Sequence, residues 1–355
     1  MTRNYQDMKL GMKQKIALLF SLLIIAAGSL FAYFAGCNLK PYLKIPENSY
    51  ETTSVVSEEE KILCPFEGIT INENLYKTLA VIYDNHNQAL PHTGIASACF
   101  VLETLAEGGI TRIEAFFAHR QPKALGPVRS ARIYFVDFAL SYDALLAHCG
   151  GSPDALQTLR KLPIDLDQIR FPEPYYRVKN RSAPHNLYGR IDDLLSLAKK
   201  RGYDLNPIST LYFSFRAFEL SNETTFVAKK IVVPFSSRSY TYTWIYDEKK
   251  GIYIRYTTKG VYIDTLTGSP PPVKNLIVIM APMKVRDQKG RLDMALNGRG
   301  AAWYFYRGTA ATGFYEKVQG KPFKFFLKNG EEVQFEPGLI WLEIIPADKK
   351  PLVSG

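Results

Sequence analysis

The sequence predicts an α+β or α/β protein, with an N-terminal α/β domain on a mixed sheet followed by a mostly antiparallel β domain. Two textures indicate this class. Over residues 61–205, short apolar runs alternate with segments whose apolar residues recur at helical spacing. Over residues 220–350, β-branched and aromatic runs are separated by turn residues. A chain of 355 residues has room for a separate core in each part.

In the N-terminal part, short apolar runs predict strands over residues 79–83, 99–102, 113–117 and 144–148. Amphipathic spacing predicts helices from Pro127 through Leu140, from Ser152-Pro153-Asp154 onward, and over residues 192–201. Proline favours the first turn of a helix, and glycine, as at Gly202, favours the position after its end. Strands interleaved with helices in this way indicate a mixed sheet.

The C-terminal part contains β-branched and aromatic runs over residues 240–246, 252–257, 276–280, 301–306 and 340–345. Lys-Lys-Gly, Thr-Gly-Ser-Pro and Lys-Asn-Gly-Glu segments separate these runs, and such segments are typical of turns. We therefore expect these runs to form a mostly antiparallel sheet.

The N-terminal segment, residues 1–37, is typical of an export signal. Lys9, Lys13 and Lys15 precede an uncharged run that is mostly Leu, Ile, Ala and Phe and ends at Cys37. A positive flank, an apolar stretch and small residues form the pattern of a secretory signal.

Residues 34–37 resemble a bacterial lipobox, in which the chain is cut before Cys37 and this cysteine carries the lipid, although Phe34 replaces the usual Leu. An uncleaved membrane anchor is the alternative, because roughly 20 apolar residues span a bilayer. A buried core helix is a third. Both exported alternatives place the folded part outside the cytoplasm, with residues 38–60 as a polar, flexible tether at the membrane.

A formal net charge of +10 favours encounters with anionic lipid heads and anionic wall polymers. Nucleic acid is not expected as a partner of an exported protein without a nucleic-acid motif. Beyond the lipobox, the cysteines are Cys64, Cys99 and Cys149, which is an odd number. They fit either a Cys99–Cys149 disulfide or, more simply, free thiols.

All five histidines lie between residues 86 and 185, and this stretch is where we expect a site: His86, His92, His119, His148 and His185. The same stretch holds four unusual short motifs: Tyr83–His86, Glu107–Arg112, Gly126–Arg132 and His148–Ser152. Histidine, arginine, carboxylate and paired glycine together are typical of a polar binding pocket.

The segment Gly126–Arg132 is the strongest candidate for anion binding. If Pro127 begins a helix, Arg129 and Arg132 lie on one side of its first turns. The free N–H groups and positive end of such a helix favour an anion, and arginine adds bidentate contacts. The alternative is that both arginines pair with internal acids, of which Glu103, Glu107, Asp137 and Asp143 are candidates.

Two further motifs leave a functional and a structural interpretation open. Asp84, Asn85 and His86 follow a predicted strand at the end where ligands approach open sheets, or they simply form a polar turn. Glu107 and Arg112 flank a Gly-Gly hairpin turn and form a cross-strand pair, or Arg112 serves as a pocket cation.

Arg177 and Arg181, near Tyr175 and Tyr176, could contact a glycan or peptide, or could belong to an ordered surface loop. The histidines show no metal-binding spacing with Asp84, so we expect neither a metal nor a cofactor. Ser130 and Ser152 lie outside a G-x-S-x-G motif, and no catalytic residue is assigned.

These motifs resemble those of the YerB-like family of bacterial lipoproteins. The resemblance rests on Asp84–His86, Glu107–Arg112, Gly126–Arg132, His148 with Gly150–Ser152, Pro184–Tyr188, Val273–Asn275 and Pro337–Trp341. It covers roughly residues 62–346 and implies a lipid-anchored α/β domain followed by a β domain of unknown function. Cys99 stands where the resemblance implies Asp, Tyr315 where it implies Trp, and Cys149 where a small Ala is commoner.

The sequence therefore predicts a membrane-tethered, extracytoplasmic binding or accessory protein of the bacterial cell envelope, and an enzyme is the less favoured interpretation. Its ligand would be a wall-derived glycan, peptide or polymer, or a partner wall enzyme. The alternative is a hydrolase or metal-dependent enzyme that uses Asp84, His86 and His148. A solute-binding lipoprotein would need two similar lobes, which the two textures exclude. The expected ligand-binding residues are Asp84, Asn85, His86, Glu103, Glu107, Arg112, Arg129, Arg132, His148, Arg177, Arg181 and His185.

Overall fold

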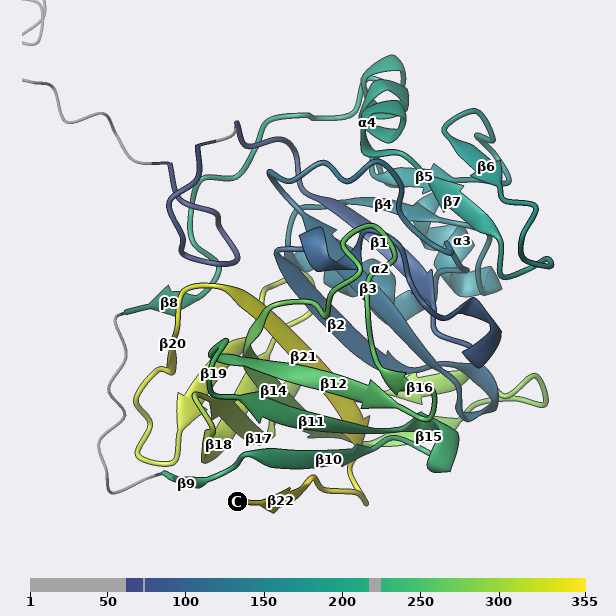
Figure 1. The fold of residues 1–355 in the computed structure, drawn as a ribbon. Helices are drawn as coiled ribbons and strands as arrows, with labels where there is room; N and C mark the ends of the chain where they lie inside the picture. The colour runs from purple at the N-terminus through teal and green to yellow at the C-terminus, as the bar shows by residue number, and fades with distance from the viewer. Residues whose placement is uncertain (1–61, 73, 217–224) are drawn as a thin grey trace, which may run out of the picture. The chain divides into compact units, whose positions relative to one another are not determined.

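The computed structural model describes residues 62–72, 74–216 and 225–355. The predicted signal, the predicted lipidation site at Cys37 and the predicted tether lie outside these described residues. The described residues belong to one compact unit that runs from Glu59 to Gly355, and Figure 1 shows that it is built mostly of strands.

The N-terminal part contains strands β1 (Leu79–Asp84), β2 (Phe100–Leu105), β3 (Thr111–Phe117), β4 (Leu145–His148), β5 (Asp165–Asp167), β6 (Tyr175–Arg177) and β7 (Leu187–Gly189). Strand β1 is antiparallel to β3 and parallel to β4, and β4 is parallel to β5. Strands β2 and β3 form the expected antiparallel pair. The prediction of a mixed sheet is therefore confirmed.

The α-helices of the described part are α2 (Ile133–Ser141), α3 (Pro153–Leu159) and α4 (Ile191–Lys200). Helix α3 begins at a proline after Ser152, as predicted, although the Ser152 side chain makes no capping hydrogen bond. Helix α4 carries acids in its first turn and lysines in its last, which complements the helix dipole. None of the helices that the structure describes is long and apolar enough to cross a membrane.

The C-terminal part contains strands β8 (Ser214–Phe215), β9 (Phe226–Val227), β10 (Lys230–Pro234), β11 (Thr241–Asp247), β12 (Ile252–Thr257), β13 (Gly260–Val261), β14 (Val273–Ala281), β15 (Met283–Val285), β16 (Leu292–Met294), β17 (Gly298–Tyr306), β18 (Thr309–Lys317), β19 (Lys324–Leu327), β20 (Gln334–Phe335), β21 (Leu339–Pro346) and β22 (Leu352–Ser354). Strands β10, β11 and β12 are antiparallel neighbours, as are β14, β17, β18 and β19. All five predicted strands of this part are present.

Strand β21 joins the two parts. It is parallel to β14 on one side and to β2 on the other, so a single mixed sheet runs from β22 through β21 to β5. Figure 1 shows β21 between the blue strands of the N-terminal part and the green strands of the C-terminal part. The fold is better described as mostly β than as α/β, and the boundaries 61–205 and 220–350 stay a prediction because the two parts share this sheet.

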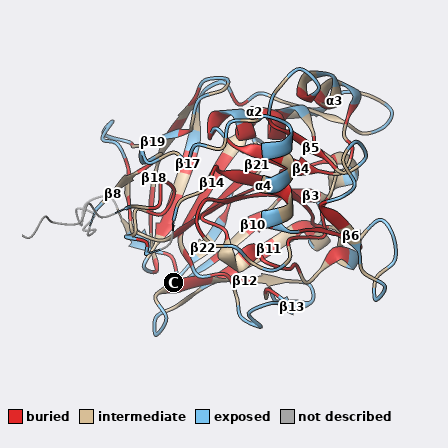
Figure 2. Ribbon diagram, turned by 90° about the horizontal axis from the view of Figure 1, so that it is seen from above, coloured by how far each residue is buried: buried red, intermediate tan, exposed pale blue. Residues whose placement is uncertain are grey.

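The shared sheet is buried on both faces. Alternate residues of β1 enter different cores, since Ala80 and Ile82 belong to one and Val81 and Tyr83 to the other. Figure 2 shows continuous burial along the central strands. Burial on both faces explains why these strands are apolar runs rather than alternating patterns.

One predicted helix is present but begins later than predicted. Pro127 does not begin a helix, because α2 starts at Ile133 with Arg132 as its N-cap. The N–H groups that a helix would leave free are used by other strands. Val128 donates to the Leu187 carbonyl at 2.7 Å, and Arg129 donates to the Ile82 carbonyl at 2.8 Å. Residues 127–131 are therefore extended.

A buried group of polar side chains, which we call the Arg255 cluster (Asn85, Glu103, Tyr242, Arg255 and Glu343), connects the two parts. The Arg255 guanidinium on β12 lies 2.8 Å from Glu103 on β2, and both side chains are at most 1% exposed. Glu343 on β21 is directly opposite Glu103 in the parallel register. Burial and the neighbouring charge of Glu103 raise the pKa of Glu343 well above the ordinary glutamate range.

We predict that Arg255→Met lowers the free energy of unfolding by about 3–5 kcal/mol, because it leaves the Glu103 carboxylate buried without its cation. Glu343→Gln, the matched control, should cost little at pH 7, since a protonated Glu343 and a glutamine present similar groups. Urea unfolding followed by tryptophan fluorescence measures both variants, and Trp244 and Trp341 lie beside the cluster.

Glu343→Gln is also expected to change how the free energy of unfolding depends on pH. A carboxyl whose folded pKa is raised contributes stability that is lost as the pH rises above its unfolded pKa of about 4.3. Glu343→Gln should therefore reduce the loss of stability between pH 5 and pH 8 that the native chain shows. Equal destabilisation by the two substitutions would contradict the assignment of the charge to Glu103.

Candidate functional site

A polar cluster lies at the C-terminal end of β1, and we call it the Asp84 cluster (Asp84, His86, Arg129 and His185). The Asp84 carboxylate is 2.8 Å from Nδ1 of His185 and 3.5 Å from Nε of Arg129. It also accepts the His86 N–H at 3.1 Å. Because a carboxylate only accepts, Nδ1 of His185 carries the hydrogen of this bond.

The two histidines of the Asp84 cluster are stacked. Their ring centroids are 4.8 Å apart and the rings are within 14° of parallel. Nδ1 of His86 accepts the Gln88 N–H at 3.2 Å, so in the neutral ring Nε2 carries the hydrogen. The Asp84 side chain is 4% exposed, whereas the Arg129 side chain is 31% exposed, so the cluster has a buried acid and a reachable cation.

Electrostatics at the cluster favour negative charge. Burial acts to raise the pKa of Asp84, but the His86 N–H, Arg129 and His185 outweigh it and lower that pKa. The pKa of His86 is lowered by burial, by His185 and by the charges of Arg129 and Lys259. One carboxylate thus stands among several cationic groups.

The segment before α2 holds Arg129 at the cluster. Its neighbours are β1 on one side and β7 on the other, through the bonds that Arg129 and Val128 donate. Asp84 donates its N–H to the Pro127 carbonyl at 2.9 Å. Gly126 has a φ of +149°, and a Cβ there would lie 2.8 Å from the Leu187 carbonyl, so the close approach requires glycine.

Glu107, Arg112 and Arg132 form a second group. Arg132 makes two hydrogen bonds to the Glu107 carboxylate, one of them 2.6 Å long. Arg112 donates to the Ser130 carbonyl at 2.9 Å and is 3.9 Å from Glu107. Arg129 and Arg132 therefore do not share a helix face, and the predicted helix-end anion site is wrong. For Arg132 the geometry fits the internal ion pair that was the alternative.

Three other predicted site residues, Asn85, Glu103 and His148, have partners elsewhere. Asn85 points away from Asp84 and donates to Glu103 at 2.8 Å, inside the Arg255 cluster. His148 is fully buried, with Nε2 at 2.9 Å from Asp165 and Nδ1 at 2.8 Å from the Gly150 carbonyl. Both ring nitrogens of His148 are thus engaged outside the Asp84 cluster.

The two arginines of the 175–185 loop organise backbone and neighbouring side chains. Arg177 donates to Asn186 at 2.8 Å. Arg181 donates to the carbonyls of Ala89 and Pro91, the second at 2.7 Å. Arg181 thereby ties this loop to the segment that follows His86, which places a further positive charge near the Asp84 cluster.

Sequence reasoning missed two groups that complete the surroundings of Asp84. His92 is buried, and its Nε2 lies 2.7 Å from the Asp84 carbonyl while Nδ1 lies 2.5 Å from the Tyr262 hydroxyl. Burial lowers the pKa of His92 to about 3, so this ring is neutral. Exposed Lys259 donates to the Asn87 carbonyl at 2.5 Å. No local motif marks the contact of His92 with Tyr262 or that of Lys259 with Asn87, since these join residues 170 and 172 positions apart.

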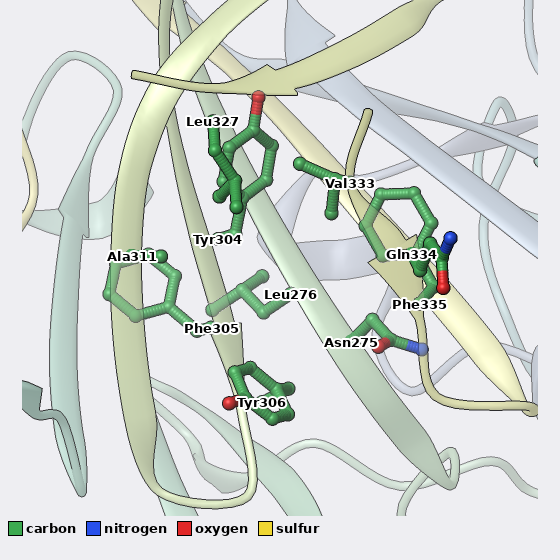
Figure 3. Close-up of a pocket in the computed structure, with 10 residues that line it drawn as sticks. All are labelled: Asn275, Leu276, Tyr304, Phe305, Tyr306, Ala311, Leu327, Val333, Gln334 and Phe335. Atoms are coloured by element: carbon green, nitrogen blue, oxygen red, sulfur yellow. The ribbon is translucent and has the colours of Figure 1, made fainter. Parts of the chain in front are cut away.

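The hollows that the structure outlines lie away from this cluster. Figure 3 shows one of them between β14, β17 and β20, with mostly apolar side chains facing it. Its volume is only about 10 Å³, roughly the space that one water molecule needs. Solvent reaches the Asp84 cluster through Arg129, whose side chain is 31% exposed, so the cluster is suited to contact one charged group of a larger ligand.

The fold and these contacts define a mostly β protein whose mixed sheet carries a polar cluster at the end of a buried strand. The N-terminal domain of the DUF3048 family, described as a protein of unknown function, matches residues 68–204. The C-terminal domain of the same family matches residues 231–342. The chain belongs to this family.

Two comparisons with one relative agree with this. The chain is 31% identical to the "Putative lipoprotein YerB" of Bacillus subtilis (strain 168) over 267 residues, which are 74% of this chain and 79% of that protein. The crystal structure of the YerB protein from Bacillus subtilis superposes with a TM-score of 0.75 at 29% identity, covering 83% of this chain and 100% of that one. The resemblance inferred from the motifs is confirmed.

We predict that Asp84→Asn lowers the free energy of unfolding at pH 7 by about 1–3 kcal/mol, because charged hydrogen bonds to a buried acceptor are lost. A lowered folded pKa contributes stability above the unfolded value of about 3.9, and this stability is lost as the pH falls through the folded pKa. The variant should therefore lose less stability than the native chain between pH 5 and pH 2. Asp348→Asn, which changes an exposed acid outside the helices and strands, is the control that should change neither value.

Proposed function

We propose that this chain is a membrane-tethered, extracytoplasmic binding or accessory protein of the bacterial cell envelope. Its Asp84 cluster would bind an anionic group of a wall-derived glycan, peptide or polymer, or of a partner wall enzyme. The observation that carries the proposal is the partly exposed Arg129 beside the stacked His86 and His185, at the end of β1.

The charge around the cluster supports an anionic ligand. Arg129 and His185 both face the single carboxylate of Asp84. Arg181 and Lys259 add positive charge through their contacts with the chain just after His86. An incoming phosphate or carboxylate would meet Arg129 as a charge-assisted donor and Nε2 of the two imidazoles as further donors.

Support for the tether comes from the sequence and from the relative. The lysines before an uncharged run that ends at Cys37 have the pattern of a lipoprotein signal. The Bacillus subtilis relative carries the name of a lipoprotein. A tether of about twenty residues would hold the Asp84 cluster close to the membrane and its wall polymers.

Catalysis has weaker support. The hydrolase alternative needs Asp84, His86 and His148 to act together, yet His148 is committed to Asp165 and the Gly150 carbonyl. A binding site requires only converging donors, and the Asp84 cluster provides these. We therefore propose binding and assign no reaction.

Arg129→Ala should weaken binding of inorganic phosphate and of a purified anionic wall polymer by roughly tenfold or more, because a charge-assisted hydrogen bond contributes about 1.5–3 kcal/mol. Isothermal titration calorimetry on the full chain in mild detergent measures the affinity, and a melting curve measures stability. Arg299→Ala, an exposed arginine paired with Glu316, is the control. Unfolding of Arg129→Ala, or unchanged affinity, would contradict the proposal.

Cys37→Ser should prevent lipidation and leave an unprocessed or mislocalised chain, because the thiol is the acceptor of the lipid. Metabolic labelling with a fatty-acid probe should mark the native protein and miss the variant. Cys149→Ser, which changes a free cysteine of the folded part, should label normally. Equal labelling of the native chain and Cys37→Ser would exclude lipidation at Cys37.

A further inference from the structure

Four metal-binding side chains converge at a point that the Asp84 cluster does not include. We call them the Cys64 cluster (Cys64, Glu67, Cys99 and His119). One ligand atom from each lies within 4.8 Å of all the others, and all four residues are at most 5% exposed. Oε2 of Glu67 is 3.1 Å from Nε2 of His119, close to the edge of about 3.3 Å that two zinc ligands span in a tetrahedron.

Three separate chain segments supply the ligands. Cys64 and Glu67 belong to a tight loop in which Cys64 donates to the Ile69 carbonyl and Gly68 donates back to Cys64. Cys99 directly precedes β2, and His119 follows the end of β3. Strands β2 and β3 are paired, so Cys99 and His119 are fixed at the same edge, while the loop is placed by Phe66, which stacks on Phe100.

We propose that Cys64, Glu67, Cys99 and His119 bind one Zn²⁺ ion as a structural site that fastens the start of the folded part to β2 and β3. Two thiolates, an imidazole and a carboxylate are a donor set that zinc accepts. All four positions are filled by protein, which is typical of structural rather than catalytic zinc. This inference is independent of the proposed function, because it concerns other residues.

The charges around the cluster balance in both states. Two thiolates and one carboxylate bring three negative charges, which Zn²⁺ and the Arg120 guanidinium neutralise. Arg120 lies 2.9 Å from Oε2 of Glu67 and stays beside the site as an outer partner. Without the metal, protons take its place: bonds with Cys64 and Glu67 outweigh burial and raise the pKa of His119 to about 9.

Metal binding is therefore an exchange of protons for zinc. Zinc–sulfur bonds form at Cys64 and Cys99, a zinc–nitrogen bond at His119 and a zinc–oxygen bond at Glu67. The protons of Cys99 and His119 leave to solvent. The bond with Cys99 lowers the pKa of Cys64, which favours the thiolate form that binds metal. Affinity for zinc should fall as the pH decreases from 8 to 6.

The test uses the full chain, purified in mild detergent with reductant and stripped with a chelator. Titration with ZnCl₂ against a chromophoric chelator should give one bound ion per chain and a higher melting temperature. Co²⁺ should give thiolate-to-cobalt charge-transfer bands. Cys99→Ser should weaken zinc binding by more than the roughly 10–100-fold that loss of an outer partner costs, and Glu67→Gln should weaken it while retaining the thiolate bands.

Cys149→Ser is the matched control, because Cys149 donates to Gln168 outside the cluster. It should leave the affinity, the bands and the melting temperature unchanged. Absence of stoichiometric zinc, or equal loss of zinc in Cys149→Ser, would overturn the proposal. So would a Cys64–Cys99 disulfide in protein isolated without reductant from the native envelope, detected by mass spectrometry of unreduced peptides. Circular dichroism of each apo variant separates loss of a ligand from loss of the fold.

Discussion

The buried contact between Arg255 and Glu103 is the interaction on which the arrangement of this protein depends. The guanidinium comes from β12 of the C-terminal part and the carboxylate from β2 of the N-terminal part, which β14 and β21 separate in the strand order. The Arg255 guanidinium lies over the rings of Tyr242 and Trp341, 3.7 Å and 5.2 Å from their centroids. A charge taken out of water is tolerated only with such partners, so the contact fixes how the two parts of the sheet meet.

The candidate binding site is connected to this contact through Asn85. Asn85 is anchored to Glu103 and Tyr242, and it lies between Asp84 and His86 in the chain. The C-terminal part also reaches Asp84 through Tyr262 and His92. Nδ1 of the neutral imidazole accepts from the Tyr262 hydroxyl, and Nε2 donates to the Asp84 carbonyl. The backbone at the end of β1 is thus held by contacts with the sheet that both parts share, while the Arg129 side chain stays accessible.

The proposed zinc ligands show the same dependence on distant contacts. A thiol and a carboxylate three residues apart are common in any chain, and Cys64 and Glu67 carry no recognisable motif. They become ligands because the pairing of β2 with β3 brings Cys99 and His119 beside their loop. For this reason the sequence led us to expect no metal, with the histidines weighed only against Asp84.

The sequence by itself determined the elements whose hydrogen bonds and burial follow from local composition. Apolar runs such as Leu79–Asp84 are strands because they can be buried on both faces of a sheet, and Pro153 begins a helix because its ring favours the first turn. Tertiary structure decided where residues 127–131 donate their N–H groups. These residues, which were predicted to begin a helix, are therefore an extended segment. It also decided that β21 lies between β14 and β2 and that Arg132 pairs with Glu107. These outcomes depend on partners far away in the chain. The packing of the whole sheet, rather than any local pattern, stabilises these contacts.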